Sequence, residues 1–223
     1  MILPRGLVFL STIWIFAAWA LCIGIRPPVQ PSIDSYLPGI RLFFATIAIG
    51  LCVAWPMLRL SESPTPAPIR QILVDFTALM VLLHVVLWPL RLATNWTAAR
   101  MGLIDLLLFA WAAIIGAILA KTIGSRSAFE RVSTMLIILA IVLLGPIAIY
   151  FNMHLNWAAP PHWIDGPILG VLRETLGGGV SPNALTWQAT LGICLAAISA
   201  WSVVMLLHFT SPNRLKKPSQ NLG

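Results

Sequence analysis

The sequence predicts an all-α integral membrane protein that crosses the bilayer about six times. Of its 223 residues, 59% are hydrophobic and 9% are charged, with a mean hydropathy of +0.90, whereas soluble domains carry about 25% charged residues. The apolar residues form runs of about 20, the length that one helix needs to cross a hydrocarbon core of roughly 30 Å. Backbone groups in lipid must be satisfied within the segment, so these runs are expected to be helices.

The six runs end at residues that stop a helix or settle at the membrane surface. The first ends at Arg26, the second at Arg59 and the third at Arg91, each with a proline within three residues. Proline cannot continue a helix, and tryptophan and arginine favour the headgroup level. We expect one transmembrane domain over residues 1–210, with spans at about 7–25, 40–58, 71–90, 101–120, 132–152 and 185–208, and a basic tail over 211–223.

The lysines and arginines predict the orientation of the chain. Under six spans, nine of them fall on one side and five on the other. Loops on the cytoplasmic side carry the excess of basic residues, so both termini are predicted in the cytoplasm, in a bacterial inner membrane. The residues predicted on the cytoplasmic side are Arg5, Arg59, Arg70, Lys121, Arg126, Arg131, Arg214, Lys216 and Lys217. Those predicted on the other side are Arg26, Arg41, Arg91, Arg100 and Arg173.

The loop over residues 153–184 is the longest segment outside the predicted spans, and we expect it outside the cytoplasm. Asp165 and Pro167 are typical of a helix start, and Gly177 is typical of a helix end. We expect an amphipathic helix over about 167–176, lying flat on the outer surface with Arg173 and Glu174 away from its apolar side. The apolar side would consist of Ile168, Leu169, Leu172 and Leu176.

Small residues recur every four positions in three of the spans, which lets helix backbones approach closely. We expect these faces to pack together, either within this chain or against other membrane subunits or a second copy. The three sets are Thr46, Gly50 and Ala54; Ala112, Gly116 and Ala120; and Gly192, Ala196 and Ala200.

His84 lies deep in the third span, and its depth can be compared with that of Asp105 in the fourth. If the two spans form a hairpin whose turn centres near Asn95, His84 lies about eleven residues before the turn and Asp105 about ten after it. At roughly 1.5 Å per residue, the two side chains have similar depths. His84 and Asp105 are therefore a candidate intramembrane polar pair.

Two interpretations of this pair stay open. It could relay protons or hold a cation, because ionisable groups in hydrocarbon cost several kcal/mol and often mark such sites. Alternatively, a neutral histidine hydrogen-bonds to a neighbouring helix, and Asp105, like Asp75, lies near a helix N-terminus that stabilises its carboxylate. Asp75, Arg91 and Arg100 are the candidate supporting charges.

No cofactor and no metal site is predicted. His154, His162 and Asp165 are metal-binding residue types in the long loop, but they lack a known ligand spacing. His84 and His208 lie at opposite ends of their spans, too far apart to share one haem iron. The basic residues stand singly at the ends of apolar runs, so no nucleic acid partner is expected.

No catalytic motif is present in the sequence, such as GxxxxGK[ST], HExxH or GxSxG. We therefore expect a non-catalytic subunit or assembly component of a larger membrane complex. The alternative is the permease of a transporter or exporter with a separate ATPase, because the six spans and the loop helix before the last one resemble the layout of ABC-2-type permeases. About six residues precede the first span, and residues 61–70 would couple to the ATPase. A membrane enzyme using His84, Asp105 or the loop histidines is the third reading.

Overall fold

The computed structural model describes residues 5–24, 33–155, 165–177 and 179–210, and this part of the chain consists of helices and the loops that join them, without strands. Six helical segments are long and apolar enough to cross a membrane, which confirms the predicted fold class. The elements are α1 (Arg5–Cys22), α2 (Ile33–Ile49), the π-helical turn η1 (Gly50–Ala54), α3 (Trp55–Ser61), α4 (Pro68–Ala93), α5 (Ala98–Thr122), α6 (Ala128–Leu155), α7 (Gly166–Thr175) and α8 (Ala184–Thr210).

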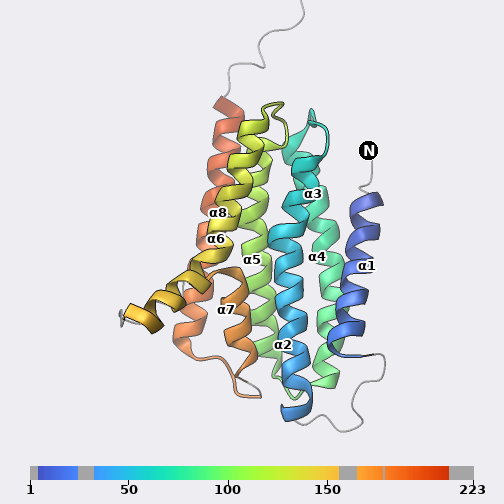
Figure 1. The fold of residues 1–223 in the computed structure, drawn as a ribbon, viewed down its shortest axis with the longest axis vertical. Helices are drawn as coiled ribbons and strands as arrows, with labels where there is room; N and C mark the ends of the chain where they lie inside the picture. The colour runs from blue at the N-terminus through green and yellow to red at the C-terminus, as the bar shows by residue number, and fades with distance from the viewer. Residues whose placement is uncertain (1–4, 25–32, 156–164, 178, 211–223) are drawn as a thin grey trace, which may run out of the picture.

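The helices stand side by side around α5, which is the most buried span (Figure 1). We call the end with loops 62–67 and 123–127 the basic rim, and the end with loop 94–97 and α7 the α7 rim. The start of α1 and the end of α8 both lie at the basic rim (Figure 1). Residues 25–32 and the tail over 211–223, which includes Lys216, lie outside the described residues.

The second span is one continuous helical path through α2, η1 and α3. It begins at Ile33, a full turn or more before the expected start at residue 40, because the helix extends beyond the apolar run that the prediction followed. Pro56 has no backbone N–H, and just before it the hydrogen bonds change register, with the N–H of Trp55 bonding to the carbonyl of Gly50. Such a π-turn is a local widening of the helix and is frequent at functional sites.

Helix α6 changes direction in its second half, where Figure 1 shows it swinging away from the bundle. Pro146 lies inside the helix at this place, and an interior proline removes a hydrogen bond and bends the helix. Helix α7 begins against this bend, with the backbone of Asp165 packed on Gly145.

Helix α7 stands beside α2 and α5 along the bundle (Figure 1), whereas we expected it to lie flat on the surface. Its fully buried side chains are Val171 and Thr175, neither of which belongs to the predicted apolar side, and Leu176 of that side is exposed. Arg173 is exposed as expected, but Glu174 is buried, because Arg100 of α5 binds it. The amphipathic pattern thus located the helix but assigned part of its buried side wrongly.

Replacing Gly145 with Ala is expected to destabilise the protein by about 1–3 kcal/mol, because the added Cβ would collide with the backbone of Asp165. Thermal unfolding in a mild detergent measures this loss. The control is Gly192→Ala in α8, where an added Cβ meets nothing within 4 Å; alanine there should leave stability unchanged or slightly higher. Equal unfolding temperatures for the two variants would contradict this packing.

The three small-residue faces do not pack on one another. The α5 face is buried, and a Cβ on Gly116 would approach Ile72, Trp55 and Trp201. On η1, Gly50 accommodates Trp14 of α1. On α8, Gly192 and Ala196 are exposed, since α8 packs on α5 through its other side, where the indole N–H of Trp201 donates to the carbonyl of Ala113 at 2.9 Å.

Candidate functional site

The structure brings His84 of α4 and Asp105 of α5 together near the α7 rim. The imidazole Nε2 of His84 lies 2.9 Å from Oδ2 of Asp105. The other ring nitrogen, Nδ1, lies 2.7 Å from the backbone carbonyl of Met80, one turn earlier in α4. The indole N–H of Trp88 points to the same Oδ2 at 3.4 Å. Two adjacent helices are thus joined by polar side chains within their membrane-spanning parts.

These contacts determine how many protons the pair holds. The carbonyl of Met80 can only accept a hydrogen bond, so Nδ1 of His84 carries a hydrogen. A proton must also lie between Nε2 and Oδ2, because two lone pairs facing each other at 2.9 Å would repel. Whether this proton rests on the imidazole or on Asp105, the net charge of the pair is zero. A neutral pair is far less costly in a membrane than an isolated carboxylate.

The two members of the pair differ in exposure. The Asp105 side chain is 11% exposed, and its Oδ1 has no hydrogen-bond partner in the described part of the chain. The His84 side chain is 46% exposed and lies on the outward side of α4 together with Val81, Val85 and Trp88. The pair is therefore accessible from the side of the bundle through His84 and closed toward its interior at Asp105.

Asp75, a predicted supporting charge, lies at the basic rim and joins a different cluster. Its carboxylate is fully buried and is held by both Nε and Nη2 of Arg59, the latter at 2.5 Å, and by Gln71 at 3.0 Å. The third guanidinium nitrogen of Arg59 binds Glu62. The guanidinium of Arg59 on α3 thus compensates the charge of the buried Asp75 carboxylate on α4. This ion pair stabilises Asp75 more than the helix N-terminus that we expected to do so.

Arg131, at the start of α6, extends this network to the loops. Its guanidinium donates to the carbonyl of Leu60 at 2.9 Å, to that of Glu62 at 2.5 Å and to that of Ser125 at 3.0 Å. Two loops of the basic rim are thereby bound to α6 through backbone groups.

Arg100, the second predicted supporting charge, binds the end of α7 and the segment after it. Its Nη1 donates to the backbone carbonyl and to Oε2 of Glu174, at 2.8 and 3.2 Å, and Nε and Nη2 both donate to the carbonyl of Val180, at 2.8 and 2.6 Å. A side chain on Gly177 would overlap the guanidinium, so any other residue there would have to displace Arg100. Arg100 is a clamp on α7 and has no contact with His84 or Asp105 among the described residues.

The remaining predicted residues are separate from the pair. Arg91 is exposed, and Asp165 pairs with Arg173 at 2.5 Å across the first two turns of α7. His154 packs on the ring of Tyr150 in α6, with the ring centroids 4.4 Å apart, and His162 lies outside the described residues. Within the ranges that the structure describes, no three histidine, cysteine, aspartate or glutamate side chains gather as metal ligands would.

The charged clusters that sequence reasoning missed are the forks of Arg59 and Arg100. Counting residues outward from a turn placed His84 and Asp105 at similar depths. The same count from the loop over 62–67 brings Arg59 near Asp75, because the arginine side chain is long. The partners of Arg100 lie 74 and 80 residues away, and no sequence pattern pointed to them. No protein-family model matches this chain, and neither do the curated proteins or the solved structures.

Proposed function

We propose that this protein is a non-catalytic subunit of a larger membrane complex, and that a transmembrane helix of another subunit packs on the outward side of α4 around His84. The observation that carries the proposal is the half-exposed imidazole of His84 within a membrane span. His84 lies 16 residues after the start of α4 and nine before its end, or roughly 14 Å from the end at the α7 rim.

Lipid chains offer no hydrogen-bond partners, so intramembrane polar side chains usually face protein or water. The neighbours of His84 on the exposed surface are Val81 and Val85, at 58% and 67% exposure, with Trp88 nearer the rim. Both ring nitrogens of His84 are engaged, by the carbonyl of Met80 and by Asp105, so a partner helix would contact the ring by packing rather than by a new hydrogen bond. The partner we infer is an apolar helix that covers the imidazole together with Val81 and Val85 and shields the polar pair from lipid.

The other charged clusters support a structural role. Arg59, Arg100, Arg131 and Arg173 all bind groups of this chain, and their contacts join α3 to α4, α5 to α7 and the loops of the basic rim to α6. A rigid bundle of this kind suits a component that holds other subunits in place.

The permease of a transporter is a second candidate. In its favour, α7 lies between α6 and α8, and the loop over 62–67 is short and fixed by Arg131 through the carbonyl of Glu62, at the rim where we expect the cytoplasm. A rigid loop at this place could transmit force from an ATPase. This second candidate requires a nucleotide-binding subunit in the purified complex, and our first proposal does not.

The test is co-purification in mild detergent with an affinity-tagged chain. We expect the wild type to retain a stable set of other membrane proteins. His84→Leu should retain roughly 5- to 30-fold less of one of them, because it changes the shape of the surface under the partner helix and leaves Asp105 without its His84 contact; this loss is the equivalent of about 1–2 kcal/mol. Ser199→Leu is the control, because it also replaces an exposed polar side chain in a span, on α8.

Two outcomes would contradict the proposal. The first is a wild-type chain that purifies without any other membrane protein, because a subunit should retain its complex. An associated nucleotide-binding subunit would favour the permease instead.

A further inference from the structure

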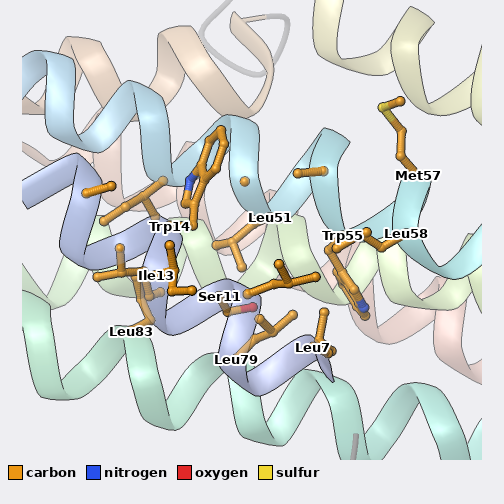
Figure 2. Close-up of a pocket in the computed structure, with 16 residues that line it drawn as sticks. Leu7, Ser11, Ile13, Trp14, Leu51, Trp55, Met57, Leu58, Leu79 and Leu83 are labelled. Carbon is orange, nitrogen blue, oxygen red and sulfur yellow. The ribbon is translucent and has the colours of Figure 1, made fainter. Parts of the chain in front are cut away.

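A cavity of about 440 Å³ lies between α1, the η1 and α3 part of the second span, and α4 (Figure 2). This volume is within the roughly 300–1,000 Å³ range of small-molecule sites, which often lie between the helices of bundles. Its walls are apolar, with Leu51, Leu79 and Leu83 among the lining residues, and none of the lining residues is charged.

Two features of the surrounding helices shape the wall of the cavity. Trp14 of α1 lies on Gly50, and its indole N–H donates to the carbonyl of Thr46 at 3.2 Å. A Cβ on Gly50 would come within 2.7 Å of that indole nitrogen, so glycine permits the contact. The π-turn over Gly50–Ala54 contributes Gly50, Leu51 and Ala54 to the lining beside Trp14. Trp14 and the widened helix thus form one continuous part of the cavity wall, and Leu79 and Leu83 of α4 form another part.

Ser11 supplies a hydroxyl group to this apolar cavity. Its oxygen lies on the side of α1 that faces Leu51 and Leu79 (Figure 2). Hydroxyls within membrane helices usually donate to the carbonyl four residues earlier, as Thr12, Thr46 and Thr77 do here, each at 2.8 Å. Ser11 makes no such bond and has no hydrogen-bond partner within the described ranges. The indole N–H of Trp55, on another wall, is also buried without a partner there.

The cavity can be reached from the bilayer. Leu10 and Ile13 of α1 and Met57 of α3 line it, and these three side chains are also about half exposed on the outer surface of the bundle. A molecule dissolved in the membrane can therefore reach the cavity by displacing flexible apolar side chains, without crossing the packed core around α5.

We propose that this cavity binds a long-chain lipid whose hydrocarbon chain lies along α1, α3 and α4 and whose carbonyl oxygen accepts a hydrogen bond from Ser11. The apolar lining recognises the chain, and the hydroxyl of Ser11 distinguishes a carbonyl-bearing lipid from a plain hydrocarbon. The uncharged walls exclude a phosphate headgroup or a free carboxylate from the interior of the cavity. This site is separate from the His84 surface and does not depend on the function proposed above.

The experiment compares two photoactivatable probes of equal chain length on the full chain in lipid nanodiscs. One is a diazirine-bearing fatty acid methyl ester and the other is the corresponding diazirine-bearing alkane. We expect the ester to label peptides from residues 7–17 and 47–58 about fivefold more than the alkane, the preference that one hydrogen bond provides. Ser11→Ala should remove the difference between the probes, since the alkane has no oxygen.

Filling the cavity provides the second variant. Ala54→Phe should lower labelling by both probes, whereas Ala196→Phe, on the exposed side of α8, should not. Equal labelling of the wild type by ester and alkane would overturn the proposal, and so would labelling spread evenly over α6 and α8. Because Ser11→Ala removes one oxygen atom from α1, its result remains decisive even if Ala54→Phe fails to fold.

Discussion

Replacing Arg59 with Met is expected to lower the free energy of unfolding by about 3–5 kcal/mol. Arg59 is 8% exposed and holds the fully buried carboxylate of Asp75 by two of its nitrogens. Removing one partner of a buried ion pair leaves an uncompensated charge, which costs more than the pair contributes. Titration of the folded protein with a denaturing detergent measures the change.

Two further variants test this explanation. The double variant Arg59→Met/Asp75→Leu should recover most of the lost stability, because an apolar pair replaces both charges. Arg70→Met removes an exposed arginine near the same rim and should change stability by less than about 0.5 kcal/mol. If Arg59→Met were as stable as Arg70→Met, the buried pair would have no role in holding α3 on α4.

Replacing Arg100 with Met is expected to cost a similar amount, about 3–5 kcal/mol, and to release α7 from the bundle. Arg100 is 5% exposed and is bonded to Glu174 and to the carbonyl of Val180. Without the guanidinium, the buried carboxylate of Glu174 loses the ion pair with Arg100 at 3.2 Å. Hydrogen exchange should therefore accelerate over residues 166–177 more than over α5.

Arg91→Met is the matched control for this prediction, because Arg91 is an exposed arginine in the last turn of α4, near the same rim. Arg100→Lys should be intermediate, since lysine keeps the charge but cannot reproduce the fork of donors. Unchanged exchange over residues 166–177 in Arg100→Met would show that α7 is held by its apolar contacts alone.

The six spans were predictable because the bilayer imposes a length of about 20 apolar residues on each helix. The start of the second span was misplaced because hydropathy follows side chains, whereas a helix can extend into polar sequence such as Ser35. The widened turn before Pro56 was also missed, since proline predicts an interruption of the helix but not the bonding pattern that replaces it.

The polar contacts were predictable only where chain geometry restricts them. His84 and Asp105 lie on adjacent helices joined by a short turn, so counting residues places them at one depth. Glu174 was expected to point away from the apolar side of its helix, yet α7 docks upright and buries it against Arg100. That arrangement depends on the bend at Pro146, which opens space for α7, and the direction of a proline bend cannot be read from the residues around it.

The cavity beside α1 depends on a contact between two helices that sequence periodicity does not predict. Trp14 and Gly50 were visible separately, one as an apolar residue and the other as part of a small-residue face. Their contact requires α1 and the second span to pack in one particular register. Ser11 was likewise unremarkable in the sequence, because serine in a membrane helix normally bonds to its own backbone.

Site-specific photo-crosslinking in native membranes tests the proposed subunit role most directly. A photoactivatable phenylalanine analogue is placed at Val85, beside His84 on α4, and at Leu195 on α8, two positions of similar exposure at 67% and 64%. We predict a discrete adduct with one other membrane protein from position 85, absent at position 195 and weakened by His84→Leu. Adducts with lipid alone at position 85, or the same protein adducts at both positions, would contradict a partner helix at His84.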